Sequence, residues 1–473
     1  MISPISLRIS GAHFAMLRDV LFPGDGREHI AFLTCGNHAG TDRQVLLVQS
    51  VRAAPRSAYL TQSDLHVSWS TDWLVPLLEE AASKRLSLIK VHSHPGGLDR
   101  FSTTDNKADR SLLHAIRNWT EHDLPHGSAV MLPDGKMFGR IRRTNGNFVP
   151  LQRISVAGPT IRVWDSHEAN AKSEWFASHT MAFGDELQSV LDCLRIGVVG
   201  CSGTGSPLIE NLTRLGVGEL LLVDDDVVEH RNLNRIIHAT RQDAMHARAK
   251  VEVIAKAVNG YGLRTVATPL KLNLASPQAI QSLASCDVVF GCMDTIEGRF
   301  LLNMLATHYV IPYFDLGVRI DARPSTNNKP AITEVAATIH YLQPGLSSLL
   351  TRGVISMEGV RAEGLRRTDP DAYQEEAHSG YIVGVAAQRP GVASVNMHVA
   401  SLAASDFIGR LCPYRQTPVE NDAVACIRVS LASLDLITER ENGDICPVIA
   451  PHVGRGDIEP LLGMPMFSTR SAA

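Results

Sequence analysis

Residues 195–226 read RIGVVGCSGTGSPLIENLTRLGVGELLLVDDD, and this stretch decides the fold class of the C-terminal part of the chain. RIGVVG is a short apolar run typical of a buried strand, SPLIENLTRLG has the spacing of an amphipathic helix, and ELLLVDDD is a second apolar strand. The same rhythm continues through a helix in AKVEVIAKAVNG and a third strand in CDVVFGCMD. Strand–helix–strand alternation predicts a parallel, doubly wound, Rossmann-like α/β sheet.

Residues 1–150 predict a separate, mixed α/β domain. Its strand-like runs are HIAFLTCG, QVLLVQSV, LSLIKVHSHP and SAVMLPDG, and its helical patterns are STDWLVPLLEEAASKR and DNKADRSLLHAIRNWTEH. The Asp-Gly pair at 134–135 indicates a hairpin turn. We expect a linker and helical lead-in over residues 151–185 and the second domain over residues 186–473. There, the polar residues 321–390 predict an irregular excursion, followed by a helix in VASVNMHVASLAASDFIGRL.

The composition is that of an ordinary soluble globular protein. The 473 residues, 44% hydrophobic and 20% charged, suffice for two or three cores. A net charge of -4 without a basic run gives no reason to expect nucleic acid or a membrane surface as a partner. We expect no signal peptide and no membrane span. The eight cysteines form no CxxC pair, which predicts a reduced, cytoplasmic protein.

The first candidate site lies between His92 and Asp105. His92 and His94 close the strand SLIKV, and residues two apart on a strand point to the same face, so both can reach one ion. After seven further residues, Ser102 begins an S-x-x-D string in which Asp105 adds an oxygen ligand at the start of a helix. Three protein ligands with an open position for water are typical of catalytic zinc, although the ligand set also suits other divalent metals.

Amide hydrolysis at such a site also needs a carboxylate that accepts a proton and passes it to the leaving amine. Glu28, in the strand candidate GREHIAFLTCG, is our candidate for that role, and the Ser102 hydroxyl suits the developing oxyanion. The alternative interpretation is structural: His92 and His94 are buried core residues, and Asp105 merely caps its helix.

The whole string, together with the strands around it, resembles the JAB/MPN (JAMM) metalloprotease family, which has a cytidine-deaminase-like fold. The resemblance implies cleavage of peptide or isopeptide bonds at the C-terminal glycine of ubiquitin-like proteins. It also implies that His92, His94 and Asp105 are the zinc ligands, Glu28 the general acid/base and Ser102 the oxyanion stabiliser.

The second candidate site begins at the glycine-rich loop that follows the strand RIGVVG and opens a helix. A backbone without side chains at Gly200, Gly203 and Gly205 can approach phosphates, and a helix N-terminus favours anions. Asp224 ends the next strand, where an acidic residue accepts hydrogen bonds from ribose hydroxyls. These features alone would also fit an NAD-dependent oxidoreductase.

Four residues further along favour a different chemistry. Arg235 and Lys250 place two cations where they can neutralise a triphosphate, with Asn232 nearby, and Asp294 could hold a magnesium ion. A carboxylate could then displace pyrophosphate from ATP to give an acyl-adenylate. An oxidoreductase has no use for these residues. The alternative interpretation makes Arg235 and Lys250 solvated surface charges.

The stretch RLGVGELLLVDDDVVEHRNLNR, with residues 180–320 and 390–410 around it, resembles the ThiF/MoeB family of ubiquitin-activating-type enzymes. The resemblance implies a homodimer and ATP contacts by the glycine loop, Asp224, Asn232, Arg235 and Lys250, with Asp294 on magnesium. Ser178 and His179 stand where the family usually has Arg-Gln, and no cysteine lies between Cys292 and Cys412. Cys446 is the one late candidate for a nucleophile, since an exposed loop could lower its pKa, and the alternative is an inert residue or a remnant of a zinc site.

The two resemblances together predict a bifunctional enzyme of a prokaryotic ubiquitin-like or sulfur-carrier system, with Zn²⁺ and ATP–Mg²⁺ as cofactors. Its partners would be a small protein with a C-terminal glycine and a conjugating enzyme. Such fusions resemble components of bacterial conjugation operons, including antiphage defence islands. In an alternative hypothesis, the ThiF-like half does not adenylate and docks the ubiquitin-like protein for the protease.

Overall fold

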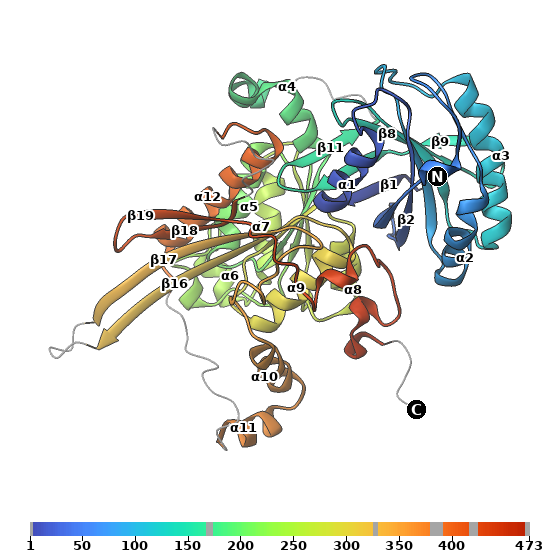
Figure 1. Ribbon diagram of the computed structural model, residues 1–473. Coiled ribbons are helices and arrows are strands. Elements are labelled where there is room, and N and C mark those ends of the chain that lie inside the picture. The colour runs from blue at the N-terminus through green and yellow to red at the C-terminus, as the bar shows by residue number, and fades with distance from the viewer. Residues whose placement is uncertain (1–2, 167–173, 325–329, 379–390, 416–423, 469–473) are drawn as a thin grey trace. The chain divides into compact units, whose positions relative to one another are not determined.

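The computed structural model describes residues 3–166, 174–324, 330–378, 391–415 and 424–468 (Figure 1). The chain forms two compact units. The first contains residues 1–168, 308–310 and 452–473, and the second contains residues 169–307 and 311–451. Each unit is built around one large sheet.

The first unit is a nine-stranded mixed sheet with the order β11-β10-β1-β3-β2-β6-β7-β8-β9. Its strands are β1 (Ile5–Ser10), β2 (Ile30–Ala39), β3 (Gln44–Ala53), β6 (Ser87–Ser93), β7 (His126–Met131), β8 (Met137–Arg142), β9 (Phe148–Pro150), β10 (Arg153–Ala157) and β11 (Ile161–Asp165). A separate hairpin consists of β4 (Tyr59–Gln62) and β5 (Val67–Trp69). The Asp-Gly turn joins β7 and β8 as an antiparallel pair, as the sequence predicted.

Helices cover both faces of this sheet. They are α1 (Gly11–Leu21), α2 (Val75–Lys84) and α3 (Thr103–Thr120). Successive residues of a strand point to opposite faces, and β2 follows this rule. Leu33 packs in a core with Leu17 of α1, whereas Phe32 packs in a second core with Leu77 of α2 and Leu113 of α3.

Two parts of the first unit differ from the sequence-based expectation. Residues 153–165, assigned to a linker, form β10 and β11, because β10 pairs in parallel with β1 and completes its hydrogen bonding. Residues 452–473, assigned to the second domain, belong to the first unit. The lead-in helix is present as α4 (Ala177–Cys193), while residues 167–173 of the expected linker lie outside the described residues.

The second unit is an eight-stranded sheet with the order β14-β13-β12-β15-β16-β17-β18-β19. The pairs from β14 to β16 are parallel, as strand–helix alternation predicted, and the remaining pairs are antiparallel. The strands are β12 (Arg195–Val199), β13 (Glu219–Val223), β14 (Val266–Leu270), β15 (Val288–Gly291), β16 (Tyr313–Pro324), β17 (Pro330–Leu342), β18 (Val424–Ser430) and β19 (Asp435–Arg440). The helices are α5 (Gly205–Leu215), α6 (Arg241–Met245), α7 (Lys250–Gly260), α8 (Pro277–Ala284), α9 (Ile296–His308), α10 (Met357–Thr368), α11 (Pro370–His378) and α12 (Ala393–Leu411).

The excursion over residues 321–390 is more regular than its polar composition predicted. The ends of β16 and β17 continue it as a long antiparallel ribbon, which the ladder of backbone hydrogen bonds stabilises independently of side-chain polarity. The helices α10 and α11 follow, and residues 325–329 and 379–390 lie outside the described residues.

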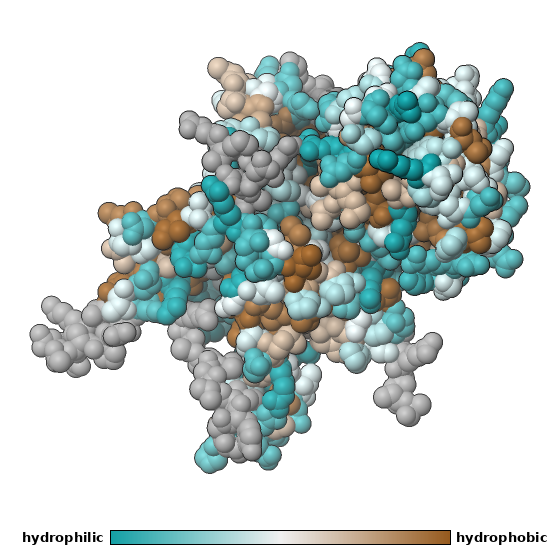
Figure 2. Space-filling model, in the orientation of Figure 1, coloured by the Kyte–Doolittle hydropathy of each residue, from teal (hydrophilic) through white to brown (hydrophobic). Residues whose placement is uncertain are grey.

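At one edge of the second sheet, apolar side chains are exposed beside β19. Figure 2 shows hydrophobic surface over the end of the β18–β19 hairpin, and Leu434, Leu436 and Ile437 of this hairpin are exposed. None of the helices that the structure describes is long and apolar enough to cross a membrane.

Candidate functional site

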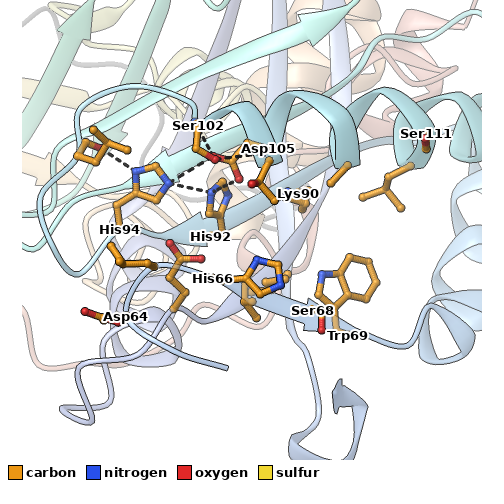
Figure 3. A pocket seen from close by; sticks show the side chains of 18 of the residues that line it. Asp64, His66, Ser68, Trp69, Lys90, His92, His94, Ser102, Asp105 and Ser111 are labelled. Atoms are coloured by element: carbon orange, nitrogen blue, oxygen red, sulfur yellow. Dashed lines mark hydrogen bonds and ion pairs between the residues drawn. The ribbon is translucent and has the colours of Figure 1, made fainter. Parts of the chain in front are cut away.

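The first unit brings His92, His94 and Asp105 together at the end of β6 (Figure 3). The two Nε2 atoms are 3.1 Å apart, and Asp105 oxygens lie 3.1 Å from Nε2 of His92 and 3.6 Å from Nε2 of His94. Ligands at zinc bond lengths in tetrahedral geometry are about 3.3 Å apart. The three side chains therefore lie close enough together to share one metal ion.

The start of α3 fixes the direction of the Asp105 carboxylate. Ser102 is the N-cap of α3, and its hydroxyl accepts a hydrogen bond from the backbone of Asp105. In return, the Asp105 carboxylate accepts hydrogen bonds from the backbone N–H of Ser102 at 2.8 Å and from its hydroxyl at 2.7 Å. This capping box shows that capping and metal ligation are compatible, because the second carboxylate oxygen of Asp105 faces His92.

The two histidines are held differently. Nδ1 of His94 lies 2.7 Å from the carbonyl oxygen of Leu98, so this nitrogen donates and Nε2 keeps its lone pair for a metal. Nδ1 of His92 is buried and has no hydrogen-bond partner among the residues that the structure describes. Burial lowers the pKa of His92 to about 4, so its imidazole is neutral and able to bind a metal near pH 7.

Glu28 lies just before β2 rather than on it, and its backbone N–H donates to Ser63 at 2.8 Å. Its side chain lines the same cavity as the three candidate ligands. Glu28 is only 8% exposed, and burial raises its pKa to about 7. A carboxyl group with this pKa can both accept and return a proton near neutral pH.

The cavity has a volume of about 640 Å³ and extends from the metal ligands between the β4–β5 hairpin and α3. Its lining includes the apolar side chains of Leu112 from α3 and of Trp69 from β5, the latter labelled in Figure 3. The sequence pattern did not point to these residues or to Lys90. Lys90 could have been found, because it precedes His92 by two residues on the same strand and so shares its face.

In the second unit, the glycine loop packs closely against the backbone and side chains around it. Gly200 has a φ of 91°, which L side chains rarely adopt, and lies against the backbone of Cys292. A Cβ at Gly205 would overlap the carbonyl oxygen of Gly200, and one at Gly203 would meet the side chains of Arg235 and Asn396. Glycine is therefore required at Gly200 and Gly205, whereas the neighbours of Gly203 are flexible side chains.

The structure places the other predicted nucleotide-site residues around this loop. Asp224 accepts a hydrogen bond of 2.7 Å from the backbone of Cys201 within the loop, and burial raises its pKa. Lys250 donates to Asp226 at 2.6 Å and lies 4.0 Å from Asp224. These contacts argue against Lys250 as a solvated surface charge.

The remaining three predicted nucleotide-site residues are Asp294, Asn232 and Arg235. Asp294 is exposed three residues beyond β15, directly after the segment that contacts Gly200. The Asn232 side chain accepts from the backbone of Glu229 and so caps a local turn. Arg235 donates to the carbonyl oxygen of Arg231, beside Gly203.

The structure does not support Cys446 as a nucleophile and agrees with the alternative of an inert residue. Cys446 is 1% exposed, and its backbone N–H donates to Leu346 at 3.1 Å. Because Cys446 is buried, its thiol is not accessible as a nucleophile.

Comparison with known proteins agrees with the division of the chain into an N-terminal and a C-terminal domain. The ThiF family matches residues 176–447, and the family described as prokaryotic homologs of the JAB domain matches residues 12–143. Ubiquitin-like modifier-activating enzyme 5 of Culex quinquefasciatus is 26% identical over 235 residues, covering 47% of this chain and 55% of that protein. SAMP-activating enzyme E1 of Haloferax volcanii is 36% identical over 130 residues, covering 27% of this chain and 47% of that protein.

The chain thus spans about half the length of these curated relatives. Among solved structures, E. coli MccB with MccA-N7isoASN is 18% identical with a TM-score of 0.45, and the match covers 59% of this chain and 75% of that one. The ThiF match extends over more than half of the sequence. The chain therefore belongs to the ThiF family and carries, N-terminal to its ThiF domain, a domain of the prokaryotic JAB kind.

Proposed function

We propose that the protein hydrolyses an amide bond at the C-terminal glycine of a small ubiquitin-like protein and adenylates that glycine with ATP at a second site. The observation that carries the proposal is the convergence of His92, His94 and Asp105 beside the buried carboxyl group of Glu28. The ThiF family membership of the same chain supports the second activity.

In the hydrolytic half, His92, His94 and Asp105 would hold zinc, which supplies Lewis acidity and an activated water when bound. Glu28 would take up a proton and return it to the leaving amine, for which its pKa of about 7 is suited. Ser102 would stabilise the oxyanion by turning its hydroxyl to the substrate, because its backbone N–H alone can still hold the Asp105 carboxylate.

In the adenylating half, the glycine loop and the start of α5 would hold the phosphates of ATP. Lys250 and Arg235 would neutralise negative charge, Asp224 and Asn232 would contact the nucleotide, and Asp294 would hold magnesium. The glycine carboxylate would attack the α-phosphorus, so that a C–O–P linkage forms and pyrophosphate leaves.

The partner class follows from the names of the relatives, which describe activation of a ubiquitin-like modifier and of SAMP. We infer a small protein with a C-terminal glycine, a conjugating enzyme downstream and a homodimer formed through the ThiF domain. Covalent linkage of the two sites raises the effective concentration of the hydrolysis product at the adenylation site.

A second candidate function is docking without adenylation. It is favoured by Ser178 and His179, which replace the Arg-Gln pair usual in the family, and by the burial of Cys446. In this case the ThiF domain would hold the ubiquitin-like protein for the JAB domain.

ATP–pyrophosphate exchange in the presence of the partner separates the two functions. Adenylation predicts exchange that is lost in Asp294→Ala and retained in Asp444→Ala, which changes an exposed aspartate in the same unit. Partner binding without any exchange in the unaltered protein would rule out adenylation and favour docking.

The partner can be identified with Glu28→Ala, purified from the native host with ATP and magnesium. We expect mass spectrometry to find a small protein with a Gly-terminated tail, whole or extended beyond the glycine. A variant that holds its metal and retains no such protein would contradict the proposed substrate.

A further inference from the structure

Lys90 is a buried cation with no part in either proposed reaction. It lies on β6 two residues before His92, so both side chains share one face of the sheet. Its ammonium group donates a hydrogen bond of 2.6 Å to Asp109 of α3, and the two side chains are 6% and 0% exposed. Lys90 also lines the cavity beside Asp105 (Figure 3).

The pair Lys90–Asp109 repeats the pair His92–Asp105 one step further along both elements. The partners on β6 are two residues apart, and the partners on α3 are four residues apart, which is about one helical turn. Two side-chain contacts therefore join the same strand to the same face of the same helix. One contact is made by candidate metal ligands and the other by opposite charges.

Arg140 of β8 strengthens the second contact. It donates to Asp109 at 2.7 Å and to Asn106 of the same helix. Its guanidinium carbon lies 3.6 Å from the ring centroid of Phe101 and 4.1 Å from that of Phe148. The first turns of α3 are thus attached to both β6 and β8 by buried charged groups, whose geometry is stricter than that of apolar packing.

His92 depends on this attachment more than His94 does. A metal-binding histidine is ordinarily oriented by a hydrogen bond at its other ring nitrogen. His94 has that bond to Leu98, and among the described residues His92 has none. The distance between His92 and Asp105 is therefore set mainly by how α3 lies on β6.

We infer that Lys90 is a positioning residue whose ion pair with Asp109 holds α3 on β6 and thereby keeps Asp105 at ligand distance from His92. The inference rests on the proposed metal site. It assigns the pair a role in metal affinity, which a merely structural ion pair elsewhere in the sheet would not have.

Lys90→Met is the variant that tests it. Lys90, Arg140 and Asp109 together carry one surplus positive charge, so the variant leaves the neutral pair Arg140–Asp109 and keeps an unbranched apolar stem. The matched control is Arg153→Met. It removes the ion pair between Arg153 and Asp165, at 2.8 Å and with side chains 7% and 16% exposed, which joins β10 and β11 at the opposite edge of the same sheet.

Zinc affinity is measured by competition with a chromophoric chelator, and stability by the unfolding midpoint. Lys90→Met is expected to weaken zinc binding about tenfold, whereas Arg153→Met leaves it within about twofold at a similar loss of stability. A folded Lys90→Met variant whose zinc affinity is within about twofold of that of the unaltered protein overturns the inference. This holds even if the KM of the variant rises.

One further variant and one further control measurement complete the test. If Lys90→Met does not fold, Lys90→Gln, which keeps an N–H donor for Asp109, is judged by the same criteria. Absence of zinc binding by the unaltered protein would refute the proposed hydrolytic site itself, which is a different outcome from a variant that binds normally.

Discussion

Asp457 accepts a hydrogen bond of 3.0 Å from Nδ1 of His38, although the two residues are separated by 419 positions in the sequence. The same carboxylate accepts from the backbone of Ala39 at 2.9 Å and from the hydroxyl of Tyr309 at 3.0 Å. Burial alone would raise the pKa of Asp457, but the hydrogen bonds from His38, Ala39 and Tyr309 and the charge of His38 together outweigh burial, so the pKa is lowered. One carboxylate thus joins three separate stretches of the chain within the first unit.

Asp457→Ala is expected to destabilise the first unit by about 1–3 kcal/mol, because it leaves donors of His38 and Tyr309 without their acceptor. Urea unfolding followed by tryptophan fluorescence measures this, since Trp69, Trp73, Trp119 and Trp164 of the five tryptophans lie in the first unit. Its control is Asp99→Ala, which changes an exposed aspartate of the same unit.

The lowered pKa of Asp457 also fixes the sign of its contribution to the pH dependence of the free energy of unfolding. A carboxyl group with a lowered pKa in the folded state stabilises the fold above its ordinary pKa, near 3.9, and loses this effect as the pH falls. The difference in the free energy of unfolding between the unaltered protein and Asp457→Ala should therefore become smaller in acid. A difference that widens there would show that the charge of Asp457 is not what stabilises the unit.

His126 should make the first unit sensitive to mild acid. Its Nδ1 accepts a hydrogen bond of 3.0 Å from the backbone of Leu88, its Nε2 lies 3.2 Å from the Thr120 hydroxyl, and burial lowers its pKa to about 3. The unfolded chain takes up a proton near pH 6.5 and the folded chain does not. The free energy of unfolding should thus fall as the pH decreases below about 6.5, by up to about 1.4 kcal/mol per pH unit from this group.

Unfolding at about pH 7 and about pH 5 tests this contribution. His126→Gln should be less stable at the higher pH and show a smaller pH dependence than the unaltered protein. His114→Gln, at an exposed position of α3, should keep the full dependence. An equal pH dependence of the free energy of unfolding in all three proteins would mean that the pKa of His126 is not lowered in the folded protein.

Zinc should stabilise the first unit because it binds the folded ligand set. Free zinc at about one hundred times its dissociation constant adds about 2.7 kcal/mol. His94→Ala should abolish the zinc-dependent rise of the unfolding midpoint, whereas His66→Ala, at an exposed cavity residue outside the ligand set, should preserve it. An unchanged rise in His94→Ala would place the bound zinc elsewhere.

Gly205→Ala should impair nucleotide binding. The added Cβ would overlap the carbonyl oxygen of Gly200, so the loop must move away from the geometry that suits phosphates. We expect ATP affinity measured by calorimetry to fall more than about tenfold, or about 1.4 kcal/mol. Gly260→Ala is the control, because its Cβ would meet no atom within 4 Å. Equal losses in both variants would indicate a general effect of alanine on the domain.

The sequence by itself determined the features that lie in short stretches. The string from His92 to Asp105 covers the end of one strand and the start of the next helix, and the glycine loop has the same strand-to-helix arrangement. Residue spacing within such units fixes which side chains share a face. The parallel order from β14 to β16 and the convergence of the three candidate ligands could therefore be predicted.

Only the tertiary structure decided what depends on pairing between distant segments. Backbone pairing with β1 placed β10 in the first sheet, and a ladder of hydrogen bonds turned a polar excursion into the β16–β17 ribbon. Burial of Cys446, the attachment of Lys90 to Asp109 and the hydrogen bond from His38 to Asp457 arise from neighbours far along the chain. Local spacing encodes direction and periodicity, whereas burial and charge pairing depend on which remote surfaces meet, and no short stretch of sequence contains both partners.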